Sequence, residues 1–157
     1  MTLRPGARLG IDVGRARIGV ARCDPSAILA VPVETVARST DGDDDIRRVL
    51  ELAAEHDAIE LVVGNPLSLS GATTASTDDA VGFAERLAAA GAAVRLVDER
   101  MSTVSAQQAL RSAGKSSRKQ RPIIDQAAAV IILQHAIDAE RASGTAPGRT
   151  ISADEGL

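Results

Sequence analysis

Asp12 is the first acid whose position suggests chemistry. It lies inside the apolar segment Arg8–Val13 (RLGIDV), where strand alternation would put it on one face with Gly10 and Gly14. A carboxylate among apolar neighbours costs free energy unless it is paired or holds a metal ion, and glycines leave room beside it. Asp12 is therefore a candidate metal ligand. The alternative is a structural Asp that caps a turn.

Two further acids follow the apolar segment Ala93–Val97. Asp98, Glu99 and Arg100 come directly after this predicted strand, at the carboxyl end where ligands bind in open α/β sheets. Alternation puts the two acids on opposite faces and does not decide which one faces a site. A solvated charge cluster at the end of a strand is the alternative.

Asp125 is the third candidate. At helical spacing it shares a face with Ala128, Ala129 and Ile132, so a helix that buries this face turns the carboxylate toward the body of the protein. A place in the first turn of a helix over Ile123–Ala142 would favour the ionised form through the helix dipole. An N-terminal capping acid, which needs no metal, is the alternative.

Three acids that each look inward from neighbouring elements favour a site for Mg²⁺ or Mn²⁺. Carboxylates are the ligands that such hard cations prefer, and two ions about 3.5–4 Å apart can clamp the attacking and leaving oxygens of a phosphodiester. Acid pairs also serve glycosidases, but a sugar site normally needs aromatic platforms, and the chain has neither Trp nor Tyr. Phosphodiester hydrolysis is the predicted reaction.

Positive charge gathers between Met101 and Ile124, where there is no Asp or Glu. The basic loop Gly114–Pro122 (GKSSRKQRP) lies beside the predicted start of the helix that carries Asp125, so its cations suit a nucleic-acid backbone. A solvated surface loop is the alternative. The predicted substrate contacts are Arg100, Lys115, Arg118, Lys119, Arg121 and, in the loop Gly64–Gly71, Asn65.

The elements that position these residues follow from periodicity. Three antiparallel strands open the chain: a hairpin of Arg8–Val13 and Arg17–Cys23, then a strand within Ile28–Val36, for which Pro32 favours an edge or irregular position. Helices and strands then alternate, which is typical of parallel crossover units. They are helix Asp44–His56, strand Ile59–Val63, helix Asp78–Ala90, strand Ala93–Val97, and helices Ser102–Ala113 and Ile123–Ala142. These elements indicate the α/β fold class.

Length and composition set the outer bounds. The 157 residues, with a net charge of −3, fit one domain over residues 1–142 and a disordered tail over 143–157, which has too few apolar residues to pack. Cys23, the single cysteine, is expected to be a buried hydrophobe, with an intermolecular disulfide as the alternative. No membrane span or secretory signal is present, so we expect a cytoplasmic protein without a membrane partner. His56 and His135 are isolated and are expected to be ordinary helix residues.

Four segments together resemble the signature blocks of the YqgF family, also called RuvX. They are LGIDVGRARIGVA at Leu9–Ala21, LVVGNPLSLSG at Leu61–Gly71, VDERMSTVSA at Val97–Ala106 and DQAAAVIILQ at Asp125–Gln134. They come in the family's order and span nearly the whole predicted fold. The chain has Ser68 where the family usually has Asn.

The resemblance implies an RNase H-like fold, which is a mixed five-stranded sheet flanked by helices, and a nuclease. Its catalytic and metal-binding carboxylates would be Asp12, Glu99 and Asp125, with Asp98 in reserve for Glu99, and its cofactor would be Mg²⁺ or Mn²⁺. The implied partner is nucleic acid. It is either the 16S ribosomal RNA precursor, matured at its 5′ end in ribosome biogenesis, or branched DNA, cut as by a Holliday junction resolvase. A homodimer is a further expectation.

Two other classes compete with this interpretation. The pattern Asp12–Val13–Gly14 with Gly19 is also a phosphate hairpin of actin-like ATPases and sugar kinases, but those enzymes close two such domains around a nucleotide and this chain has one. The other rival is a non-catalytic RNA-binding module that retains the fold. Intact carboxylates weigh against it, and a metal titration would discriminate.

Overall fold

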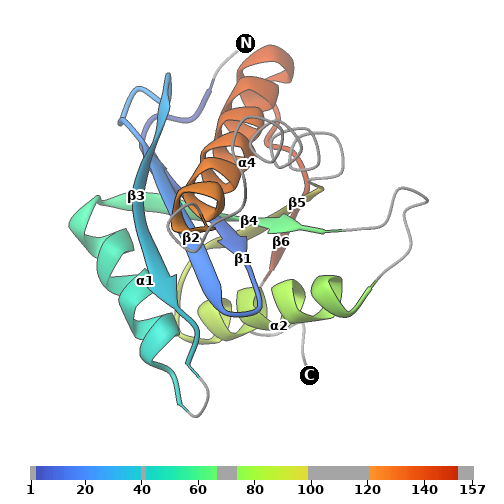
Figure 1. Cartoon of the computed structure of the whole chain (residues 1–157). Helices are drawn as coiled ribbons and strands as arrows, with labels where there is room; N and C mark the ends of the chain where they lie inside the picture. Colours follow the sequence, from blue (N-terminus) through green and yellow to red (C-terminus); the bar gives the residue numbers. More distant parts are fainter. Residues whose placement is uncertain (1–2, 40–41, 67–73, 99–120, 152–157) are drawn as a thin grey trace.

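The computed structural model describes residues 3–39, 42–66, 74–98 and 121–151. They form a mixed sheet in the order β3-β2-β1-β4-β5-β6, with helices on both faces (Figure 1). The element bounds are β1 Ala7–Val13, β2 Arg17–Cys23, β3 Ala30–Ala37, α1 Asp44–Glu55, β4 Ala58–Asn65, α2 Ala75–Ala89, β5 Val94–Asp98, α4 Arg121–Ser143 and β6 Arg149–Ile151.

The strand pairings reproduce the predicted three antiparallel strands and the parallel strands that follow them. β1, β2 and β3 pair antiparallel, and β1, β4 and β5 pair parallel, with α1 and α2 as the crossovers. Pro32 lies on β3, which is an edge strand, where its missing N–H costs no ladder hydrogen bond. The three antiparallel strands, the parallel strands and the α/β class are confirmed.

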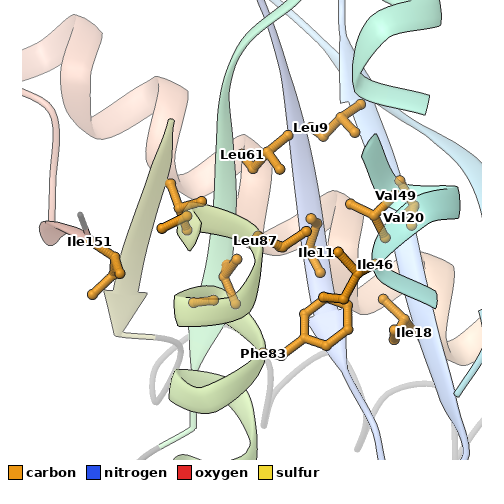
Figure 2. Packing of buried hydrophobic residues seen from close by; sticks show 14 of the residues in the cluster. Leu9, Ile11, Ile18, Val20, Ile46, Val49, Leu61, Phe83, Leu87 and Ile151 are labelled. Atoms are coloured by element: carbon orange, nitrogen blue, oxygen red, sulfur yellow. The ribbon is translucent and has the colours of Figure 1, made fainter. Parts of the chain in front are cut away.

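Alternation along the strands separates two hydrophobic layers. Leu9 and Ile11 of β1 point to the face covered by α1 and α2, where Phe83, the only aromatic residue, is buried with them (Figure 2). The opposite face, which carries Val62 and Val97, packs with the apolar side of α4. The two layers hold β1 at the centre of the molecule, and Asp12 at its carboxyl end.

The structure corrects the predicted strand count and tail. Arg149–Ile151 forms β6, a sixth strand that pairs antiparallel with β5, inside the segment predicted to be disordered. A single apolar side chain is enough here, because Ile151 is buried in the main core and Arg95 Nη1 donates to Pro147 O at 3.2 Å. The sheet therefore has six strands rather than five.

Two helices begin earlier than their periodicity predicts. α2 begins at Ala75, because Thr74 caps it and shares a capping box with Thr77. α4 begins at Arg121, so Arg121 is a helical residue rather than part of the basic loop. The predicted helix Ser102–Ala113 and the rest of that loop lie outside the described residues.

The acidic residues around the start of α1 have a structural role. Asp44 and Asp45 are in the first turn of α1. Asp45 is buried, and its carboxylate accepts hydrogen bonds from the backbone N–H groups of Ser39 at 3.2 Å and Ile46 at 2.8 Å. Asp43 is the N-cap residue but makes no side-chain capping hydrogen bond, and Asp41 lies outside the described residues.

Candidate functional site

Three predicted site residues lie at one edge of the sheet, where the parallel strands end. Asp12 is near the end of β1, Asn65 ends β4 and Asp98 ends β5. Asn65 and Asp98 are register partners, and Ile11 pairs with Val63 one residue before Asp12. Carboxyl ends of parallel strands are where ligands bind in open α/β sheets. The topology therefore assembles an oxygen-rich edge from segments far apart in the chain.

The face on which Asp12 lies is the face covered by α4. Gly10, two residues earlier on the same face, lies against the helix: an added Cβ would be 2.6 Å from Ala129 O and 2.6 Å from Leu133 Cβ. The space left by this glycine is thus filled by α4, not open for a metal and a phosphate as its sequence suggests. Glycine is needed there for close packing.

The direction of α4 brings its start over Asp12. Arg8 Nη2 donates to Glu140 at 3.2 Å, and Gly10 lies against Ala129, so α4 runs antiparallel to β1. Two strand residues advance the chain by roughly 6.6 Å, which corresponds to about four helical residues. The turn of α4 at the level of Asp12 along β1 is therefore the one that contains the backbone of Asp125.

A hydrogen bond fixes this part of α4 to the sheet. Gln126 Nε2 donates to Thr35 Oγ1 on β3 at 2.8 Å. Thr35 pairs with Gly19, and Gly19 pairs with Asp12, so the three residues form one row across β3, β2 and β1. The residue next to Asp125 is thus held in the same row as Asp12. Asp125 itself is the fifth residue of α4, beyond the first turn in which its sequence position suggests it.

Asn65, which ends β4, has a buried amide oxygen. The residue is half-buried, and within the described part of the chain its Oδ1 is buried without a hydrogen-bond partner. A buried carbonyl oxygen without a partner costs free energy. Next to it, the buried Thr77 hydroxyl donates to Pro66 O and fastens the start of α2 to the end of β4.

The turn between β1 and β2 is braced by Arg38, which the sequence did not single out. Arg38 Nη1 donates to Gly14 O at 2.8 Å, and the guanidinium binds both carboxylate oxygens of Asp79 at 2.8 and 3.0 Å. The same side chain lies 3.4 Å from Asp45 and 5.4 Å from the centroid of the Phe83 ring. These partners come from both crossover helices, so no local pattern could reveal them.

The remaining predicted residues divide into two groups. Glu99, Arg100, Lys115, Arg118 and Lys119 lie outside the described ranges. His56 follows α1 and His135 is exposed on α4, as expected of ordinary helix residues. Among the described residues no group of three or more His, Cys, Asp or Glu could hold a metal ion, and no helix is long and apolar enough to cross a membrane.

Cys23 is fully buried, and its Sγ accepts a hydrogen bond from the backbone N–H of Arg8 at 3.3 Å. Burial raises the pKa of the thiol, which lowers its reactivity. The prediction of a buried small hydrophobe is confirmed. An intermolecular disulfide would require this part of the sheet to open.

The architecture is that of an RNase H-like α/β protein. It is similar to structures of Thermus thermophilus RuvC, one alone and one in complex with a Holliday junction substrate. The complex has a TM-score of 0.55 at 18% identity and the other structure 0.53 at 21%. The alignments cover 93% and 90% of this chain and 99% of each RuvC chain. At these identities the likeness shows the fold.

The chain belongs to the RuvX family, whose model, described as Holliday junction resolvase, matches residues 6–139. Relatives named "Putative pre-16S rRNA nuclease" are 64% identical in Clavibacter sepedonicus and 58% identical in Leifsonia xyli subsp. xyli. These alignments cover 95% of this chain and 93% and 96% of the relatives. The protein is a nuclease, and nucleases with this fold generally use divalent metal ions.

Proposed function

We propose that this protein hydrolyses phosphodiester bonds in the 16S ribosomal RNA precursor, at its 5′ end, with Mg²⁺ or Mn²⁺ as cofactor. The observation that carries the proposal is the position of Asp12 at the carboxyl edge of the sheet, on the face covered by α4 and level with the turn of α4 that contains Asp125. The names of the 64% and 58% identical relatives support the RNA substrate.

The second candidate is resolution of branched DNA. It is favoured by the description of the family model and by the RuvC complex with a Holliday junction, which has the same fold. Both activities use the same chemistry on the same carboxylates. They differ in the shape of nucleic acid that the surface around the site accepts.

The residues at the edge fit a hard divalent cation. Carboxylate and amide oxygens are its preferred ligands, and Asn65 Oδ1 is a buried oxygen without a partner in the described structure. Asp12, Glu99 and Asp125 would hold the metal, which when bound stabilises charge on the phosphoryl oxygens and lowers the pKa of a coordinated water. Asn65 lies by alternation on the face opposite Asp12, at the same end of the strands, and would contact the nucleic-acid backbone of the substrate.

Within the third block we assign the catalytic role to Glu99 and keep Asp98 in reserve. Val97 packs on the α4 face, which is also the face of Asp12. By alternation, a residue two positions after Val97 would share that face if the strand geometry continued, whereas Asp98 would not. Glu99→Gln should therefore lower kcat more than Asp98→Asn at saturating metal. The reverse result would move the role to Asp98 and leave the three-carboxylate mechanism intact.

Substrate binding is assigned to the basic residues around the edge. Arg121 begins α4, the helix that carries Asp125, and the basic loop precedes it in the chain. We propose that Arg100, Lys115, Arg118, Lys119 and Arg121 bind the phosphate backbone. The protein would act in the cytoplasm, where ribosomes are assembled, and we keep a homodimer as the proposed state, which analytical ultracentrifugation would test.

A cleavage assay decides among these functions. The protein is incubated with a 16S precursor RNA, a four-way DNA junction and linear duplexes of both kinds, each with a titration of Mg²⁺ and Mn²⁺, and Asp12→Asn is the control for contaminating nucleases. Metal-dependent cleavage of the precursor at its 5′ end supports the first candidate, and symmetric cleavage of the junction supports the second. Binding without cleavage at any metal concentration would instead identify a non-catalytic RNA-binding module.

A further inference from the structure

The turn Gly14–Ala16 (the β1–β2 turn) begins two residues after Asp12 and is held by three hydrogen bonds. Gly14 N donates to Arg17 O at 2.8 Å, Arg38 N donates to Ala16 O at 3.0 Å, and Arg38 Nη1 donates to Gly14 O at 2.8 Å. A Cβ at position 14 would lie 2.7 Å from Arg17 O, so the turn depends on glycine. The backbone between Asp12 and β2 therefore has one defined path.

Arg38, the residue that braces this turn, also contacts both crossover helices, α1 and α2. Arg38 binds Asp79 of α2 through two hydrogen bonds and lies 3.4 Å from the buried carboxylate of Asp45 on α1. These charged partners raise the pKa of Arg38, with Asp79 the largest contribution, so the brace stays charged. A side chain on the turn is thus presented from a scaffold that is already ordered, which reduces the entropy lost on binding.

Arg15 is the exposed cation that this turn presents. Arg15 interacts electrostatically with Asp79, and both carboxylate oxygens of Asp79 already accept hydrogen bonds from Arg38. Arg15 acts on Asp79 only through long-range attraction, as the last and smallest of the causes that lower the pKa of that carboxyl. Within the described part of the chain its donors are therefore available to an anion, three residues after Asp12.

We infer that Arg15 is a phosphate-binding residue, which contacts the nucleic-acid backbone beside the phosphodiester cut at Asp12. The inference rests on the proposed function. It adds a contact on the β1 side of the site, whereas the basic loop lies at the start of α4. The guanidinium fork matches a phosphate with two parallel hydrogen bonds, a geometry that lysine does not reproduce.

The test is binding measured without turnover, in the Asp12→Asn background. Fluorescence anisotropy gives Kd for the precursor RNA and for the four-way DNA junction across a potassium chloride series. Arg15→Ala is compared with Arg47→Ala, which removes the same charge from an arginine on α1 that is 70% exposed and paired with Asp44. We expect Arg15→Ala to raise Kd about three- to tenfold and to reduce the salt slope by about 0.7–0.9. Arg47→Ala should change neither.

Two further readouts separate direct binding from a structural effect. In the active protein, Arg15→Ala should raise KM and leave kcat at saturating substrate unchanged, and Arg15→Lys should restore the salt slope but only part of the affinity. The inference is overturned if Arg15→Ala and Arg47→Ala bind alike while the wild type binds and cleaves. A wild type that binds neither substrate would overturn the proposed function instead.

Discussion

Acidic side chains have different surroundings at the two ends of the parallel strands. At the amino end, Glu60 and Glu140 are buried, and both are bound by arginines. Arg4 Nη2 lies 3.0 Å from Glu60 and 2.8 Å from Glu140, Arg8 Nη2 lies 3.2 Å from Glu140, and Arg95 Nε lies 3.0 Å from Glu60. Every acid of this cluster has cationic partners inside the protein.

At the carboxyl end, the acids are more accessible. Asp12 is half-buried, Asp98 is exposed, and the neighbouring Asn65 keeps a buried amide oxygen without a partner among the described residues. Buried ionised groups are tolerated when they are paired, as at the amino end, whereas accessible oxygens at a strand terminus can bind a cation or a substrate. The comparison teaches that the charges of the amino end stabilise the fold, whereas those of the carboxyl end are accessible, as the proposed chemistry requires.

The largest expected effect is that of Asp12→Asn on activity. The amide is nearly isosteric but loses the charge that we propose holds the metal, and since losing even a hydrogen-bond partner of a metal ligand costs about 10–100-fold, kcat should fall by more than about a hundredfold. Melting temperature without metal should stay equal or rise, because one carboxylate fewer reduces repulsion in the site. Asp44→Asn, an exposed acid on α1, is the control. A large drop in melting temperature with retained turnover would show that Asp12 has a structural role and not a catalytic one.

At the other end, Glu140→Gln should affect stability and not chemistry. It leaves Arg8, which is 1% exposed, without its carboxylate, and breaking a buried pair in this way costs about 3 kcal/mol or more. The midpoint of thermal unfolding should fall by roughly 6–12 °C, and kcat at 25 °C should not change. Asp138→Asn, on the same helix but exposed, should change stability far less. A loss of kcat without a loss of stability would contradict the division between the two ends.

The pH dependence of stability should report the same cluster. Hydrogen bonds from Arg4, followed by the charges of Arg4 and Arg8, lower the pKa of Glu140 from 4.5 to about 2. The unfolded chain therefore binds this proton more readily than the native protein, so the pairing stabilises the fold above about pH 4.5 and is lost as the pH falls toward 2. Denaturant unfolding of wild type and Glu140→Gln between pH 6 and 3 should converge toward low pH.

A smaller effect is expected from the hydrogen bond that positions α4. Thr35→Val removes the acceptor of Gln126 Nε2 and should lower kcat about tenfold with KM unchanged, because the turn that carries Asp125 is no longer fixed over the row of Asp12. Thr35→Ser keeps the hydroxyl and should restore activity. If valine and serine variants have equal kcat, the hydrogen bond only stabilises the packing of α4.

The smallest effect should come from the basic loop. Replacing both Arg118 and Lys119 by Ala removes two proposed phosphate-binding side chains, so Kd should rise and the salt slope of binding should fall by about 0.7–0.9 for each phosphate that is no longer bound. Metal affinity and kcat at saturating substrate should not change. If the double variant binds both RNA and junction DNA as tightly as the wild type across a salt series, this loop is only a linker. The nucleic-acid backbone would then be bound mainly near the β1–β2 turn.

The strands near the site were predictable because their signals are local. Alternating apolar residues and the glycines between them defined the hairpin of β1 and β2, and Pro32 marked an edge strand. The start of α4 was misplaced by two residues because Pro122 is tolerated in a first helical turn, where its missing N–H would have no partner anyway.

The features that sequence reasoning missed depend on distant partners. Gly10 reveals the absence of a side chain but not that Ala129 fills the space, and Arg38 gains its role only when α1, α2 and the β1–β2 turn converge. β6 was missed because three residues with one buried Ile carry no periodicity. Tertiary packing, not propensity, determines each of these.

The short strand β6 also protects the sheet from aggregation. It covers the edge of β5 that would otherwise present unpaired N–H and C=O groups to another molecule, and at three residues it offers little edge of its own. Gly148 makes this possible: its φ is +73°, and a Cβ there would overlap Leu96 O. At the opposite margin Pro32 interrupts the donors of β3. The short strand β6 and Pro32 thus limit the association of copies of this protein by strand addition.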